Sequence, residues 1–159
     1  MLKTVARTGF TAANDKTDLN QVGSVMVDGS NGKQYRYVQV EDMALAANDV
    51  VTYANATGTE VTKDRAGGSS LGSNFAGVAV NALTDAYYGW VQIKGLATCK
   101  VNANVAVAAG NRVMVDTADG CVKAYAATTG SEDYSFGMAL ANDTATTSAA
   151  GTVAVMIDL

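Results

Sequence analysis

Short runs in which hydrophobic and polar residues alternate recur along the chain, and Gly, Asn and Asp separate them at short intervals. A period of two places successive side chains on opposite faces of a β-strand, whereas an amphipathic helix needs a period near 3.6. The chain has 20 valines against 8 leucines, and β-branched valine favours strands. Because proline is absent, turns must be made by Gly, Asn, Asp and Ser. The pattern predicts an all-β fold, a compact β-barrel or β-sandwich of short strands.

The strands can be placed from the turns that flank them. Residues 23–27 and 34–40 are predicted to form a hairpin, because the intervening DGSNGK is rich in residues that tolerate positive φ. Only residues 41–48 and 102–109 permit a helix, and both stretches are too short to be stable alone. Further strands are predicted at residues 50–54, 78–81, 90–94, 96–101, 112–116, 121–125, 137–141 and 153–157.

An approximate internal repeat divides most of the chain into two similar halves. The run NDVV at 48–51 recurs as NRVM at 111–114, and glycine turns and G-x-V runs follow in the same order in both halves. The repeat predicts two copies of one β unit, at residues 44–95 and 105–159. Both would lie in a β-rich body of residues 21–159, preceded by an extended N-terminal arm of residues 1–20. Chance matching among strands rich in Val, Ala and Gly is the alternative explanation.

Several kinds of reactive site are excluded or disfavoured by the residues present. The chain has no histidine, which excludes a Ser-His-Asp triad and the usual His/Cys zinc sites. The carboxylate pairs at 41–42 and 132–133 are predicted to be solvated, because neighbours on a strand point to opposite faces. The acidic loops at 15–18 and 116–120 lack the full calcium-binding pattern, and the glycine-rich segment 66–74 lacks the lysine of a phosphate-binding loop. We expect no catalytic residue, no metal or other cofactor, and no enzymatic activity.

Composition also bears on the partners of the chain. A net charge of −4 disfavours nucleic acid, which needs a surplus of Lys and Arg on one face. No run approaches the roughly 20 apolar residues of a membrane span, and residues 1–7 lack the apolar run of a signal peptide. We therefore expect neither nucleic acid nor a membrane as a partner. Cys99 and Cys121 are expected to be buried, reduced thiols, and a redox pair is the alternative.

The N-terminal segment differs in charge from the rest of the chain. Residues 1–40 carry a net charge of +2 and the remainder −6. The first 17 residues have little to bury, so in isolation they are expected to be mobile. A segment of this kind can bind a partner through main-chain hydrogen bonds, and a frayed tail is the alternative. The candidate contact residues are Lys3, Thr4, Val5, Arg7 and Lys16.

Five motifs occur in a fixed order along the chain: GKQYRYV at 32–38, LAANDVV at 45–51, FAGVAVN at 75–81, GWVQIKG at 89–95 and AGNRV at 109–113. In these motifs and their order the chain resembles the small capsid decoration, or cement, proteins of tailed bacteriophages. Each motif is low in specificity, and their order is more specific than any one of them. Together they span most of residues 22–159, whereas residues 1–20 match nothing in the family. Asn48 and Asn111 lie next to turn positions where the family often has glycine.

The resemblance implies a virion protein that is made in the bacterial host cytoplasm and attaches to the outer surface of an icosahedral capsid. It implies that the protein stabilises the shell by bridging subunits of the major capsid protein, commonly as a homotrimer. The basic residues of the N-terminal segment would then grip the shell while the β body self-associates. Several weak contacts made together give long-lived attachment.

The aromatic residues suggest a function other than capsid stabilisation. Tyr35, Tyr37, Tyr87, Tyr88 and Trp90 are predicted to pack in the core or between subunits. If Tyr87, Tyr88 and Trp90 were instead exposed in a groove, they could stack on sugars. The alternative is therefore a carbohydrate- or receptor-binding module on the virion, such as a head-fibre tip.

Overall fold

A computed structural model describes residues 4–7, 13–65, 74–126, 135–146 and 148–158 of the chain. Eleven β-strands and no helix occur in this described part, which confirms the predicted all-β fold. The strands are β1 Thr4–Arg7, β2 Val25–Asp28, β3 Gln34–Val40, β4 Val50–Tyr53, β5 Glu60–Thr62, β6 Phe75–Ala79, β7 Tyr88–Val101, β8 Arg112–Val115, β9 Cys121–Ala124, β10 Gly137–Ala139 and β11 Gly151–Ile157.

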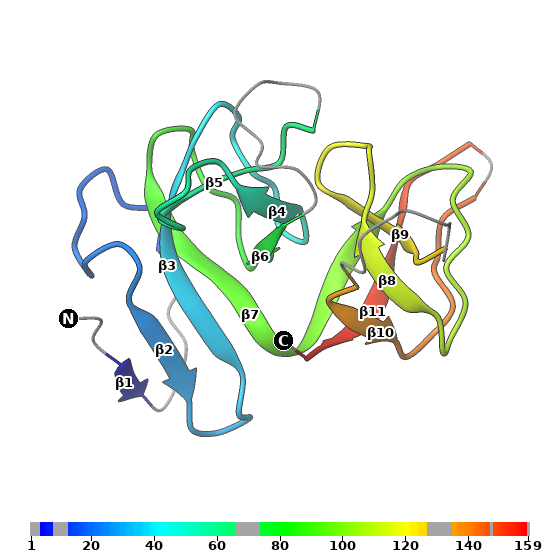
Figure 1. The fold of residues 1–159 in the computed structure, drawn as a ribbon, viewed down its shortest axis with the longest axis horizontal. Coiled ribbons are helices and arrows are strands. Elements are labelled where there is room, and N and C mark those ends of the chain that lie inside the picture. Colours follow the sequence, from blue (N-terminus) through cyan, green and yellow to red (C-terminus); the bar gives the residue numbers. More distant parts are fainter. Residues whose placement is uncertain (1–3, 8–12, 66–73, 127–134, 147, 159) are drawn as a thin grey trace.

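The strand pairings close into two five-stranded rings that share β7. The first barrel runs β3-β5-β4-β6-β7 and returns to β3, and the second runs β7-β11-β10-β8-β9 and returns to β7. In each ring one pairing is parallel, β3 with β5 and β7 with β9, and the other four are antiparallel. The two barrels therefore have the same topology. They lie side by side, with β1 and β2 on the outer side of the first (Figure 1).

Strand β7 serves both barrels because it bends without breaking. Its residues up to Lys94 pair with β3, and its residues from Gly95 onward pair with β11. Gly95 has φ 89°, a conformation that glycine adopts without strain. The buried Gln92 side chain donates to the carbonyl oxygens of Lys94 (3.1 Å) and Leu96 (2.9 Å) and so satisfies them at the bend. The sequence predicted two separate strands here, and the structure joins them.

Equivalent turns precede β4 and β8. In the first barrel, Asn48 N donates to Ala79 O (2.8 Å) and Ala79 N donates to Asp49 O (2.9 Å). In the second, Gly110 N donates to Ala139 O and Ala139 N donates to Asn111 O, both at 2.8 Å. Asp49 therefore corresponds to Asn111, one residue away from the sequence match, which aligned Asn48 with Asn111. Asn48 has φ 72° and takes the place that glycine fills in the second barrel.

Three clusters of buried side chains form the core. One fills the first barrel and includes Val38, Val51, Val61 and Val91. A larger one belongs mainly to the second barrel but also includes Val50, Phe75 and Val78 from the first. The third consists of Met26, Tyr35, Tyr37 and Trp90. Because the second cluster draws side chains from β4 and β6, the two barrels share a core.

Two of the strands were not predicted from the sequence, and the two stretches that permit a helix do not form one, as expected from their short length. β1 lies in the segment that was expected to be an extended arm, and β5 is only three residues long. Residues 41–48 and 102–109 lie in loops and bends. The loop before β4 is fixed by hydrogen bonds from Leu45 N to Leu83 O (2.8 Å) and from Leu83 N to Leu45 O (3.0 Å). These tertiary hydrogen bonds outweigh the high helix propensity of the alanines in this loop.

Candidate functional site

The N-terminal segment forms a strand at one end of the sheet. β1 pairs in parallel with β2, with Thr4 opposite Val25 and Arg7 opposite Asp28. Among the described strands, β2 is its one neighbour in the sheet. Of the predicted contact residues, Thr4, Val5 and Arg7 lie on β1, Lys16 is exposed, and Lys3 lies outside the described residues. The structure thus places three of the five on one edge strand.

Residues 13–15 are attached firmly to the first barrel. Thr84 N donates to Asn14 Oδ1 (3.0 Å), and Asn14 Nδ2 donates to Thr84 Oγ1 (3.1 Å). Asp15 and Tyr88 exchange two backbone hydrogen bonds, of 2.9 and 2.8 Å. Residues 13–15, which were predicted to belong to an extended arm of residues 1–20, therefore contact the first barrel. Polar side chains and backbone atoms of Asn14 and Asp15 make these hydrogen bonds, and such contacts cannot be recognised from the pattern of apolar residues.

The aromatic residues gather beneath this attached segment. Tyr37 is fully buried, and its hydroxyl donates to Asp15 Oδ2 (2.9 Å). The Trp90 ring lies 5.0 Å from the Tyr37 ring, between centroids, and the Tyr88 ring lies 6.2 Å from it. Burial, and after it the hydrogen bond to Asp15, raises the pKa of Tyr37 to about 12. Trp90 is only 8% exposed, so it packs into the molecule and does not present a stacking surface.

The remaining predicted aromatics differ in burial. Tyr35 is buried in the same cluster, and Tyr88 is half-buried beside it. Tyr87 is half-buried outside the three core clusters, and its carbonyl oxygen accepts a hydrogen bond from Val40 N (2.9 Å). The structure therefore brings four of the five aromatics together and leaves Tyr87 apart.

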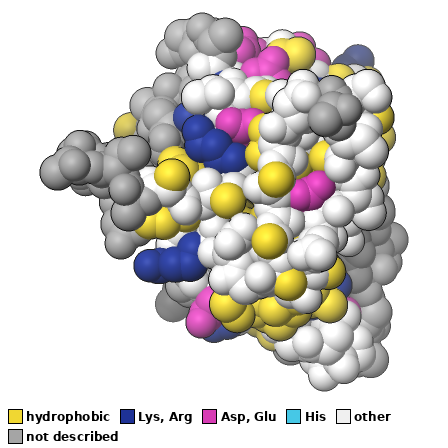
Figure 2. All heavy atoms as spheres, turned by 90° about the vertical axis from the view of Figure 1, so that its right-hand side faces the viewer, with side chains coloured by type: hydrophobic (Ala, Val, Ile, Leu, Met, Phe, Trp, Pro, Cys, Tyr) yellow, Lys and Arg dark blue, Asp and Glu magenta, His cyan; other side chains and the backbone are white. Residues whose placement is uncertain are grey.

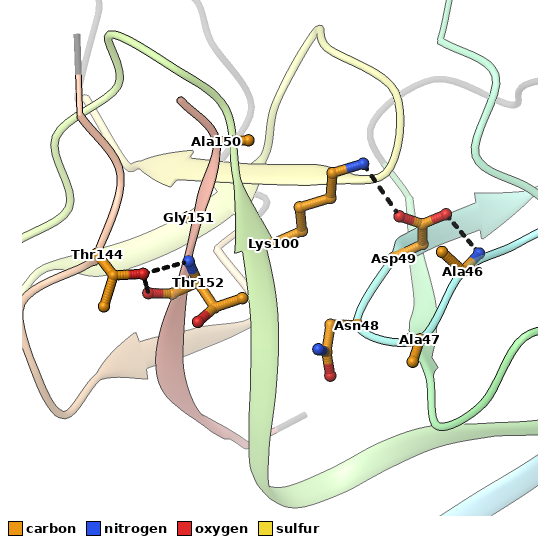
Figure 3. A pocket seen from close by; sticks show the side chains of 9 residues that line it. All are labelled: Ala46, Ala47, Asn48, Asp49, Lys100, Thr144, Ala150, Gly151 and Thr152. Carbon is orange, nitrogen blue, oxygen red and sulfur yellow. Dashed lines mark hydrogen bonds and ion pairs between the residues drawn. The ribbon is translucent and has the colours of Figure 1, made fainter. Parts of the chain in front are cut away.

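A hollow of about 440 Å³ lies where the two barrels meet (Figure 3). The Asp49 side chain is fully buried there, and it accepts hydrogen bonds from Lys63 Nζ (2.9 Å), Lys100 Nζ (3.4 Å) and Ala46 N (2.9 Å). Lys63 follows β5 and Lys100 lies on β7, so the carboxylate ties together three parts of the chain. The hollow is lined by Ala46, Ala47, Asn48, Asp49, Lys100, Thr144, Ala150, Gly151 and Thr152.

Asp49 also fixes the turn between β8 and β9. Gly120 has φ 69°, and a Cβ at this position would lie 2.8 Å from Asp49 Oδ1. Its carbonyl oxygen accepts a hydrogen bond from Val50 N (2.9 Å). A buried carboxylate with two ammonium partners has its charge compensated, which suits a structural role. This cluster was not predicted from the sequence, although an aspartate among the small and apolar residues of LAANDVV indicates a buried carboxylate.

A second set of polar contacts joins the barrels beside Gly120. Arg65 N donates to Asp119 Oδ1 (2.9 Å), and Arg65 Nε donates to Asp116 O (3.2 Å). Partial burial lowers the pKa of the Arg65 guanidinium. Asp116 Oδ1 accepts a hydrogen bond from Thr117 N (2.7 Å) and lies 3.6 Å from Lys123 Nζ. These acidic side chains, which were considered for calcium, thus have protein partners.

The other polar groups considered from the sequence are the two carboxylate pairs and the glycine-rich segment. Glu41 shares a hydrogen bond with Glu60, and this bond together with burial raises the pKa of Glu41. The pair at 132–133 and residues 66–73 lie outside the described residues. No three His, Cys, Asp or Glu side chains of the described residues converge as a metal site requires. No helix in the described ranges is long and apolar enough to cross a membrane.

Both cysteines are buried, as expected from the sequence, and both are free in the structure. Burial raises the pKa of Cys99 to about 12 and also raises the pKa of Cys121. Raised pKa values keep both thiols protonated, and a thiol is a poor nucleophile compared with a thiolate.

Comparisons with known proteins add one structural likeness. No protein-family model matches the chain, and no curated protein matches it. The chain is similar to the crystal structure of the head fibre gp8.5 N base of bacteriophage phi29, with a TM-score of 0.48 and 16% sequence identity. The match covers 78% of this chain and 92% of that chain. An identity this low does not transfer a function.

Proposed function

We propose that the chain is a structural protein of a tailed-phage virion, which binds the outer surface of the icosahedral capsid and stabilises it by bridging subunits of the major capsid protein. Its partners would be the capsid protein and further copies of itself, as a homotrimer. Attachment through several contacts needs surface and rigidity but no reaction. The proposal starts from the ordered motifs that resemble the phage decoration proteins.

The observation that carries the proposal is that these motifs build the framework of the doubled barrel. LAANDVV at 45–51 and AGNRV at 109–113 form the equivalent turns that precede β4 and β8. GKQYRYV at 32–38 forms most of β3, and GWVQIKG at 89–95 lies within β7, which both barrels share. The resemblance therefore falls on the residues that determine this topology and not on scattered surface positions.

The junction between the barrels supports a bridging role. A bridge must hold its two contact surfaces at a fixed separation, because motion between them would cost binding energy. Here β7 runs through both barrels, Phe75 stacks on Phe136, and Asp49 holds two lysines at the interface. Each connection limits movement of one barrel relative to the other.

The basic N-terminal segment is the part proposed to bind the shell, and its proposed contact residues are Lys3, Thr4, Val5, Arg7 and Lys16. The test is cosedimentation of the protein with capsids assembled without it. Deleting residues 1–12 should abolish binding and leave the body folded, because Ala13, Asn14 and Asp15 keep their bonds to the barrel. The thermal unfolding curve of the truncated protein checks that it folds. Full capsid binding by the folded truncation would exclude the segment from the mechanism.

A charge-matched pair of variants refines this test. Lys16→Ala should weaken capsid binding and reduce its dependence on salt, because it removes an exposed charge next to the segment. Lys94→Ala removes the same charge from an exposed site, where the nearest carboxylate oxygen, of Asp158, is 3.9 Å away. It should leave capsid binding unchanged. Equal losses in both variants would indicate that only net charge matters.

The alternative is a carbohydrate- or receptor-binding module such as a head-fibre tip. Such a module would have to use Tyr87 and Tyr88, because Trp90 is buried and packs against Tyr37. Replacing both tyrosines with alanine should abolish glycan binding on an array if this alternative holds, and should leave capsid binding unchanged. Glycan binding by the native protein would favour the alternative over the bridging role.

A further inference from the structure

Four exposed hydrophobic side chains lie together on one outer face of the second barrel. Among the described residues, the large hydrophobic side chains that are exposed are Leu19, Met43, Leu96, Met138, Leu140 and Met156. Leu96 lies opposite Met156, and Met156 lies opposite Met138, on the neighbouring strands β7, β11 and β10. Residues directly opposite each other on paired strands share a face. Leu140 follows Met138 by two residues, and Leu140 N donates to the carbonyl oxygen of Ala154 (2.8 Å), which precedes Met156 by two, so Leu140 lies on the same face. Figure 2 looks onto the second barrel and shows hydrophobic side chains gathered towards its lower edge, beside acidic and basic ones.

Charged residues of both signs border this row. Arg112 of β8 lies opposite Met138 and is exposed, with its guanidinium 5.9 Å from the centre of the Tyr125 ring. Asp158 follows Met156 by two residues, and its side chain is 81% exposed. These two residues and the methionines surround a hollow of about 390 Å³. The row therefore has an apolar centre, with Arg112 at one end and Asp158, whose carboxylate lies 3.9 Å from Lys94 Nζ, near the other.

We propose that a second copy of this chain covers the apolar row (Leu96, Met156, Met138 and Leu140) through a two-fold contact. In a two-fold contact the same surface meets itself, so the surface must be complementary to itself. An axis that brings Arg112 of one copy to Asp158 of the other also brings Met138 of one copy over Met156 of the other. Methionine side chains adapt their shape readily, which suits such packing.

The contact should be weak by itself. A stable interface buries about 800 Å² on each partner, and four partly exposed side chains supply much less than that. Association through the row should therefore depend on concentration and be favoured where many copies are held close together. This two-fold contact is distinct from the threefold association proposed above, and it would link molecules of neighbouring trimers.

Sedimentation velocity of the purified protein over a range of concentrations tests the inference. The mass of the native protein should double as its concentration rises, from one chain to two or from one trimer to two. Met138→Lys and Met156→Lys should each abolish the doubling, because each places a charged ammonium group in the apolar centre of the contact, where it loses its hydration. Leu19→Lys makes the same kind of change at a residue that is 69% exposed and outside the row, and it should leave the doubling intact. Thermal unfolding of each variant checks its fold.

Charge reversal tests the predicted pairing of Arg112 with Asp158. Arg112→Glu and Asp158→Lys should each weaken association at least about tenfold, because like charges would face each other. The double variant should restore association towards the native level. No doubling of the native mass, or no rescue by the double variant, would overturn the proposal. So would a Met156→Lys variant that loses capsid binding but still doubles its mass, because the shell would then be the partner of this face. The mass measurements use purified protein alone, so their outcome does not depend on capsid binding.

Discussion

Phe75 of the first barrel stacks on Phe136 of the second, with ring centroids 3.9 Å apart and planes 6° from parallel. Phe136 is almost completely buried, and Phe75 is 9% exposed. Both rings belong to the core cluster that also contains Val50 and Val78. Because each barrel contributes one ring, the contact couples the stability of the two barrels.

Replacing Phe136 with alanine should lower the free energy of unfolding by about 3–5 kcal/mol, the usual cost of removing a buried phenylalanine. Phe75→Ala should cost less, because part of that ring is already in water. The double variant should cost less than the sum of the two single changes, by about 0.5–1.5 kcal/mol for the lost pair. Urea unfolding measures all three values, and Leu19→Ala should change little. Strict additivity would show that the two rings do not interact.

The repeat could be recognised from the sequence, but its exact alignment could not. Glycines recur, as does the run that begins with asparagine (NDVV and NRVM), whereas the hydrogen bonds that show Asp49 to be equivalent to Asn111 form only in the folded chain. The sequence predicts two strands in place of β7, because a glycine such as Gly95 usually interrupts a strand. Only the structure shows that the Gln92 side chain satisfies the backbone at the bend.

The candidate site was harder to predict than the fold. Alternation of side chains indicates which face of a strand is buried, but it does not indicate which distant charges meet. Asp49 and Lys100 are 51 positions apart, and only the closure of both barrels brings them together. Asn14 and Thr84, which attach the N-terminal segment, are 70 positions apart. Polar contacts of this kind carry no periodic signal in a single sequence.

Gly120 and Gly110 provide a matched pair of substitutions. Both have positive φ, of 69° and 84°, so alanine at either position should cost about 1–2 kcal/mol of backbone strain. At Gly110 an added Cβ meets nothing within 4 Å, whereas at Gly120 it would lie 2.8 Å from Asp49 Oδ1. Gly120→Ala should therefore lower the midpoint of urea unfolding clearly more than Gly110→Ala does. Equal shifts would mean that Asp49 can move away at little cost.

Asp49→Asn separates the two roles of the buried carboxylate. The amide oxygen can still accept the hydrogen bond from Ala46 N, as Asn111 accepts one from Ala108 N. The two lysines would however lose their counter-ion, and breaking a buried ion pair in this way costs about 3–5 kcal/mol. The partial exposure of Lys63 and Lys100, 16% and 38%, should place the loss at or below the lower end of that range.

A change of background checks this explanation. When Lys63 and Lys100 are both replaced with methionine, no ammonium group is left at the carboxylate. Asp49→Asn should then lower the free energy of unfolding much less than it does in the native chain, or even raise it. Urea unfolding of the four proteins measures the difference. An unchanged cost in both backgrounds would assign the effect to hydrogen bonding and not to charge.

Stability should fall at high pH because buried groups, above all Tyr37 and Cys99, resist losing a proton. The pKa of Tyr37 rises from 10.0 to about 12 and that of Cys99 from 9.0 to about 12. A raised pKa means that the folded state holds its proton more tightly than the unfolded state does, so the contribution of each group is complete below its unfolded pKa. The contribution of Cys99 is lost between about pH 9 and 12, and that of Tyr37 between about pH 10 and 12.

Tyr37→Phe should lower the free energy of unfolding by about 1 kcal/mol at neutral pH, because the hydrogen bond to Asp15 is lost. The same change should make the decline of stability above pH 10 less steep. Urea unfolding at each pH measures the slopes, with Tyr87→Phe, outside the core clusters, as the control. A Tyr37→Phe protein whose stability declined as steeply as that of the native chain between pH 10 and 12 would contradict this assignment.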